Sequence, residues 1–77
     1  MILIDVRTKA ETDGGMIEGA IHHDIIQMMR GIFPDVSRDE EIILYCESGN
    51  RAMMAKNLME SVGFTCVKNG GGIDDLD

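Results

Sequence analysis

A short apolar run that ends at a cysteine and is followed by a helical pattern limits the fold of this chain more than any other feature. The run, Ile42 to Tyr45, is β-branched and apolar like a buried strand, and it ends at Cys46. After a short loop, apolar residues recur at helical spacing, and Gly63 stands where a left-handed cap would end the helix. These apolar residues are Ala52, Ala55, Leu58, Met59 and Val62. A strand joined to a helix by so short a loop is typical of a parallel α/β sheet.

The amino-terminal part of the chain repeats this alternation. Met1 to Ile4 reads as a second buried strand, and Thr8 with Glu11 matches a capping box that would start a short helix. Gly14-Gly15 would end that helix, and Asp24 is suited to cap another helix that continues to about residue 31. The pattern therefore predicts two strands, each followed by a helix, on either side of a polar connection.

The carboxyl-terminal part of the chain contains only short secondary-structure patterns. Phe64 to Val67 reads as one more strand, Asn69 to Gly72 as a loop, and Ile73 to Asp77 as the first part of a last helix that the chain leaves truncated. With 77 residues, the chain has room for a single hydrophobic core. We therefore expect one domain over residues 1–77.

Charge and composition exclude several classes of partner. The formal net charge is −7 and no basic run occurs, which argues against nucleic acid and against an anionic membrane surface. No apolar run approaches the roughly 20 residues needed to span a bilayer. Cys46 and Cys66 lack metal-type spacing and predict two free thiols in a reducing, cytoplasmic compartment, although a cleaved export signal would not be visible in the chain.

The residues around Cys46 combine a nucleophile with the features of an anion-binding loop. In a parallel sheet, ligands bind beyond the carboxyl ends of the strands, and Cys46 follows such an end. The helix that begins near Asn50 would leave unpaired amide groups facing the sulfur, which favours the thiolate and cradles an anion. Arg51 adds a permanent positive charge with bidentate geometry. We therefore predict a reactive cysteine, although a lone cysteine is ordinarily a buried core thiol.

Other conspicuous residues are better explained by structure. Cys66 lies within an apolar run and is expected to pack in the core rather than relay sulfur. Met53 and Met54 are ordinary core or surface methionines unless they line the mouth of the site. His22-His23 has no third ligand in view, so solvated histidines are favoured over a metal site.

Four blocks in order give the chain a resemblance to a known family. They read LIDVRTKAE, GGMIEGAIH, IILYCESGNRAMMAK and NGGGIDDL, and together they cover nearly the whole chain. The pattern resembles the single-domain rhodaneses, which are sulfurtransferases, and especially their small bacterial phage-shock-type members. The resemblance implies a small parallel β-sheet flanked by α-helices on both faces.

The resemblance also implies roles for individual residues. Cys46 would be the nucleophile that accepts sulfur, and Asp5 and Arg7 would be structural support for neighbouring loops. The rest of the substrate-binding loop would be Glu47, Ser48, Gly49, Asn50 and Arg51. Thiosulfate or another sulfane donor would form a persulfide on the cysteine, and cyanide or a thiol would then remove the outer sulfur in a ping-pong cycle. No metal or other cofactor is implied, and the protein would be a monomer or a weak dimer.

Two alternatives to this function stay open. Rhodanese-related phosphatases have a longer loop, whereas Cys46 to Arg51 is C-x-x-x-x-R, so sulfur substrates are favoured over phosphate. Glu47 places a carboxylate beside the cysteine, and this charge opposes both a thiolate and thiosulfate. The second alternative is therefore a persulfide carrier or interaction module that turns over small donors slowly and receives sulfur from a protein partner.

Overall fold

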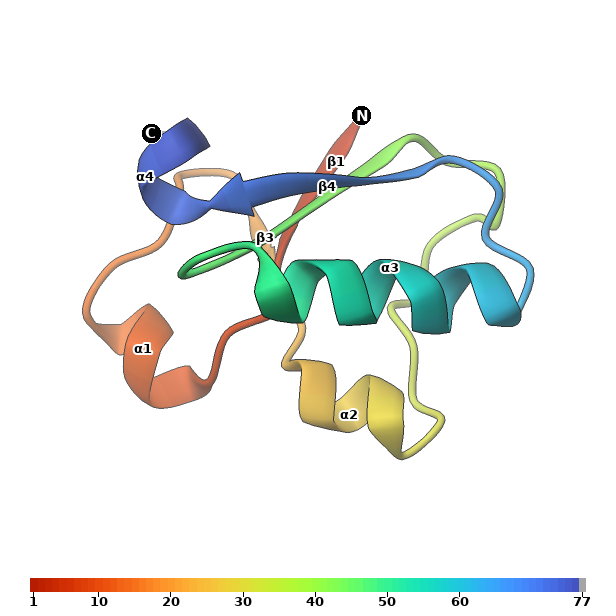
Figure 1. The fold of residues 1–77 in the computed structure, drawn as a ribbon, viewed down its shortest axis with the longest axis horizontal. Coiled ribbons are helices and arrows are strands. Elements are labelled where there is room, and N and C mark those ends of the chain that lie inside the picture. Colours follow the sequence, from red (N-terminus) through yellow and green to blue (C-terminus); the bar gives the residue numbers. More distant parts are fainter. Residues whose placement is uncertain (77) are drawn as a thin grey trace.

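The structure, a computed structural model, describes residues 1–76 as one four-stranded parallel sheet with flanking helices (Figure 1). The strands lie in the order β2, β1, β3, β4, and their bounds are β1 (Ile2–Asp5), β2 (Ile21–His22), β3 (Ile42–Cys46) and β4 (Val67–Gly72). The helices are α1 (Lys9–Asp13), α2 (Ile25–Met29), α3 (Asn50–Ser61) and α4 (Ile73–Leu76). The α/β class and the parallel sheet are as the alternation of apolar runs predicts.

The register of the two central strands brings their carboxyl ends to one edge of the sheet. β1 and β3 pair from Ile2 opposite Ile42 to Asp5 opposite Tyr45, so the two strands end almost level. Figure 1 shows the segments that lead to α1 and α3 leaving the sheet at this edge. The residues that follow both strands therefore converge on one region.

The helices cover the two faces of the sheet unequally. On one face α3 packs on β3 and β4, and α2 packs on α3, which buries a core that includes Ile42, Leu44 and Cys46 from alternate positions of β3. On the other face lies α4, a single turn, whose Leu76 approaches the side chain of Ile43 near Gly70. Helices thus lie on both faces, as the resemblance implies, and within residues 1–76 the second face is covered by the single turn of α4.

Local signals in the sequence set the ends of the helices. Thr8 and Glu11 form the expected capping box at the start of α1, and the Asp24 carboxylate accepts a hydrogen bond from the Ile26 amide at the start of α2. Gly63, at φ 102°, follows α3 in the left-handed conformation that the sequence predicts there. These ends are defined by neighbouring residues, which is why the sequence alone could place them.

The last strand differs from the expectation. The sequence predicts a strand over Phe64–Val67, but the Phe64 amide instead bonds to the Met59 carbonyl, so this residue still belongs to the cap of α3. The strand begins at Val67 and includes the glycines that the sequence assigns to a loop. A Cβ atom at Gly72 would lie 2.3 Å from the Glu47 carbonyl oxygen, so only glycine allows β4 to approach the Cys46 loop so closely.

Candidate active site

The thiol of Cys46 lies at the carboxyl end of β3 and is enclosed by the loop that follows it. Its side chain is 0% exposed and belongs to the core, while the Gly49 amide donates a hydrogen bond to Sγ at 2.9 Å. Gly49 has φ 96°, a left-handed conformation that costs glycine little, and its carbonyl accepts the first helical bond of α3 from the Met53 amide. The loop thus turns an amide toward the sulfur directly before the helix begins. Ser48 and Asn50 are exposed on the outside of this turn.

Strand β4 supports the loop from the other side. The Asn69 side chain donates to the Gly49 carbonyl at 3.0 Å and accepts from the Gly71 amide at 2.9 Å. A Cβ atom on Gly49 would lie 3.2 Å from the Gly71 Cα, so the two glycines pack backbone against backbone. Asn69 therefore helps to hold the amide that faces Cys46. Sequence reasoning missed this role because a lone asparagine beside glycines indicates only a turn.

Arg51 does not point its guanidinium into an open anion site. Its Nη1 and Nη2 atoms donate to the two carboxylate oxygens of Glu11 at 2.5 and 2.8 Å. The pKa of Arg51 is raised above its ordinary value, chiefly by these bonds and further by the negative charge of the Glu11 carboxylate. The sequence predicts an arginine available to substrate oxygens, whereas the structure engages it with a residue of α1. No local pattern could reveal this partner, because Glu11 precedes Arg51 by 40 positions.

Arg7 and Asp5 form a buried ion pair beneath the same loop. The Arg7 guanidinium donates to the Asp5 carboxylate through Nε and Nη2 at 2.8 to 3.1 Å, and Nη2 also donates to the Gly15 carbonyl at 2.7 Å. These bonds to Asp5 raise the pKa of Arg7 above its ordinary value. The remaining nitrogen, Nη1, lies 3.4 Å from the Glu47 carboxylate. Arg7 therefore connects the end of β1 to the first residue of the Cys46 loop.

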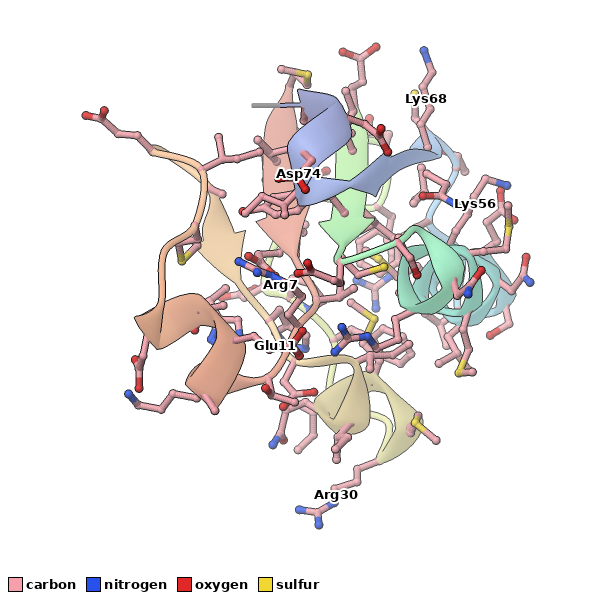
Figure 2. All side chains as sticks on the ribbon, turned by 60° about the vertical axis from the view of Figure 1, so that its left-hand side comes forward. Arg7, Glu11, Arg30, Lys56, Lys68 and Asp74 are labelled. Atoms are coloured by element: carbon pink, nitrogen blue, oxygen red, sulfur yellow. The ribbon has the colours of Figure 1, made fainter. Side chains whose placement is uncertain are left out.

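The loop is thus tied to the segment after β1 at both of its ends. Arg7 contacts Glu47, the first loop residue, and Glu11 contacts Arg51, the last. Figure 2 shows Arg7 and Glu11 near each other beyond the arrowheads of β1 and β3. In the first pair the loop supplies the carboxylate, and in the second pair it supplies the guanidinium. Each of the two arginines therefore has a carboxylate of the other segment as its partner.

The side chains of the remaining candidates take no part in the two ion pairs that hold the Cys46 loop. The Cys66 carbonyl accepts from the Ile42 amide, where β3 begins, so the second thiol is at the opposite end of the sheet from Cys46. His22 and His23 each place Nε2 at a backbone carbonyl, 2.7 and 2.9 Å away. Within residues 1–76, no three side chains group as metal ligands and no helix is long and apolar enough to cross a membrane. Met53 and Met54 are about half exposed on α3.

The pair between Glu11 and Arg51 predicts a dependence of stability on acid. Arg51 lowers the pKa of Glu11 from its ordinary 4.5 to about 2. Because the unfolded chain then takes up this proton at a higher pH than the folded chain, the stabilisation is present above pH 4.5 and is lost as the pH falls toward 2. We expect Glu11→Gln to cost about 1 kcal/mol at pH 6, since both side chains are partly hydrated, and almost nothing near pH 2. Urea unfolding of the wild type and of Glu11→Gln between pH 6 and pH 2 measures the difference in stability. A difference that stays constant over this range would contradict the prediction.

Comparison with known proteins agrees with this fold. The family model described as a rhodanese-like domain matches residues 1–75. The chain is 28% identical over 74 residues to the thiosulfate sulfurtransferase PspE of Escherichia coli K12, covering 95% of this chain and 71% of the relative. It is 34% identical over 76 residues to the putative sulfurtransferase YtwF of Bacillus subtilis 168, and the match covers 95% of this chain and 70% of that relative.

A solved structure has the same fold. The human single-domain sulfurtransferase TSTD1 superposes with a TM-score of 0.82 at 24% identity, covering 92% of this chain and 74% of that one. Identity at this level supports the architecture alone, whereas the family match covers nearly the full length. The chain therefore belongs to the rhodanese-like domain family.

Proposed function

We propose that the chain transfers sulfane sulfur through a persulfide on Cys46. The observation that carries this proposal is the 2.9 Å contact of the Gly49 amide with the Cys46 sulfur, at the end of a parallel strand and the start of a twelve-residue helix. An amide donor and a helix amino terminus both stabilise negative charge on sulfur. Sulfurtransferases among the relatives, such as PspE, support the same chemistry.

The first half-reaction forms the persulfide. The Cys46 thiolate attacks the outer sulfur of thiosulfate, a new S–S bond forms, and the original S–S bond breaks. Sulfite leaves with the bonding electrons, and Cys46 is left as a persulfide anion, so charge and sulfur both balance. The Gly49 amide, which donates to the thiol sulfur, is positioned to stabilise the negative charge before attack.

The second half-reaction releases the sulfur. A thiophilic acceptor, cyanide or a thiolate, attacks the outer sulfur and takes it as thiocyanate or as a new persulfide, and the Cys46 thiolate returns. No step needs an oxidant, a reductant or a bound cofactor. Because donor and acceptor react in turn with one cysteine, the kinetics should be ping-pong.

Access to the sulfur requires movement of the loop. Cys46 is 0% exposed, so a donor atom reaches Sγ only when residues 47–50 move outward. Glu47 and Asn50 are exposed on this loop, whereas Gly49 is buried against β4. The burial of Cys46 is the observation that favours the persulfide carrier as a second candidate function, because a loop that must first open would limit the turnover of small donors.

The proposal is tested by the intact mass of the protein after incubation with a sulfane donor. Thiosulfate and, separately, an organic persulfide should each add about 32 Da, and cyanide should remove this mass as thiocyanate. Initial rates measured over both substrates should give parallel double-reciprocal lines. An adduct that forms but turns over slowly would favour the carrier, whereas no adduct with any sulfane donor would refute sulfur transfer.

A further inference from the structure

The charges around the Cys46 loop leave little positive potential for an anionic donor. Arg51 is held by Glu11 in a bidentate pair, and Arg7 is shared between Asp5 and Glu47. These two guanidinium groups and three carboxylates together carry an excess of one negative charge. A dianion that enters this region therefore meets no uncompensated arginine among these groups.

Two further observations make the outer face of the loop acidic. The Glu47 side chain is 60% exposed, so most of it faces solvent despite the contact of its carboxylate with Arg7. On the other side of the loop, the Asp75 carboxylate accepts a hydrogen bond from the Gly72 amide at 2.8 Å, and Gly72 is the residue that pairs with Cys46 across the sheet. Glu47 therefore follows Cys46 directly in the loop, and Asp75 of α4 is bonded to the β4 residue that lies opposite Cys46 in the sheet.

We propose that Glu47 and Asp75 make this site selective for a persulfide donor that carries positive charge beside its sulfur, and selective against thiosulfate. The proposal rests on the proposed function, since it assumes that Cys46 accepts sulfur, and it names the chemical class of the donor. A cation next to the persulfide is attracted by the two carboxylates, whereas a dianion is repelled by them and by the thiolate. Glu47 and Asp75 would determine specificity by changing the rate at which a charged donor approaches Cys46.

The transfer step balances without any further reagent. The Cys46 thiolate attacks the outer sulfur of R–S–SH, a new S–S bond forms between Sγ and that sulfur, and the S–S bond of the donor breaks. R–S⁻ leaves with the electron pair, and Cys46 becomes Cys–S–SH. One thiolate and one persulfide stand on each side, and the departing thiolate is stabilised by its own neighbouring ammonium group.

The test compares two small donors and two peptides on the full chain. Cysteamine persulfide carries an ammonium group and thiosulfate is a dianion; the peptides carry one persulfidated cysteine flanked by lysines or by glutamates. The second-order rate constant for the mass gain on the protein is measured for each donor. In every case the cationic donors should react faster than thiosulfate and the glutamate peptide. If the lysine peptide reacts faster than cysteamine persulfide, the donor is a protein. If cysteamine persulfide reacts faster, the donor is a small molecule.

Variants separate the local charges from the net charge. Glu47→Gln and Asp75→Asn keep their hydrogen-bond acceptors but lose the charge, and Glu41→Gln makes the same change in net charge on an exposed residue at the other end of β3. We expect Glu47→Gln and Asp75→Asn each to lower the rate ratio of cysteamine persulfide to thiosulfate on the order of tenfold, and Glu41→Gln to leave it unchanged. Raising the salt concentration to about 0.5 M should compress the wild-type ratio in the same direction.

The outcomes distinguish this inference from the proposed function. If the wild type reacts equally fast with both small donors and Glu47→Gln leaves the ratio unchanged, charge selection is refuted while sulfur transfer stands. If Glu41→Gln changes the ratio as much as Glu47→Gln, the effect belongs to net charge and the assignment to the loop is wrong. If no donor adds sulfur to Cys46, the proposed function fails as well.

Discussion

Replacing Cys46 by serine is expected to abolish sulfur transfer, lowering the rate at least about a thousandfold to that of the uncatalysed reaction. A serine hydroxyl is not ionised near neutral pH and is a poor nucleophile toward sulfur. Its oxygen can still accept the hydrogen bond that the Gly49 amide gives to Sγ, so the loop should keep its shape. The measurement is thiocyanate formation from cyanide, together with the mass gain on the protein.

Cys66→Ser is the matched control for this substitution. Cys66 is partly buried and lies where β4 begins, at the opposite end of the sheet from Cys46. The control should retain full activity and the full mass gain. Thermal unfolding of both variants verifies that each is folded. If Cys66→Ser lost the activity and Cys46→Ser kept it, the roles assigned to the two thiols would be reversed.

The fold was predictable where its determinants are local in the sequence. The apolar run that ends at Cys46, the capping box of Thr8 and Glu11, and the glycine at 63 each depend on residues only a few positions apart. β4 was placed wrongly because Phe64 is apolar in the sequence but completes the cap of α3. Its glycines have low strand propensity, yet the close approach to the Cys46 loop requires them.

The position of the candidate site was predictable for the same reason, but its electrostatics were not. The loop sequence locates Cys46, Gly49 and the start of α3 together. Glu47 is 40 positions from Arg7 and Glu11 is 40 positions from Arg51, and such pairs leave no periodic trace in a single sequence. The sequence suggested that Arg51 offers charge to a substrate, and only the packing of α1 beside the loop shows that Glu11 already occupies it.

The buried pair of Asp5 and Arg7 should be the most costly electrostatic contact to break. Asp5 is 0% exposed and Arg7 is 4% exposed, and the carboxylate accepts hydrogen bonds from both the side chain and the backbone amide of Arg7. Asp5→Asn removes the buried counterion of a buried guanidinium and leaves it only the exposed Glu47 carboxylate at 3.4 Å, and breaking a buried pair ordinarily costs about 3 to 5 kcal/mol. A domain of this size has roughly 4 to 12 kcal/mol of total stability, so the variant should lose a large part of it, which urea unfolding measures.

Two companion variants decide whether an unpaired buried charge is the cause. Asp13→Asn removes the partner of Lys9 in a pair whose side chains are 64% and 81% exposed, and it should cost less than about 0.5 kcal/mol in urea unfolding. Adding Arg7→Met to Asp5→Asn removes the orphaned charge and should restore part of the lost stability. Since Arg7 also contacts Glu47, the double variant should leave the first loop residue untethered even where the fold is recovered. If Asp5→Asn alone cost no more stability than Asp13→Asn, water or another group would be compensating the charge of Arg7. The segment after β1 would then not depend on this pair.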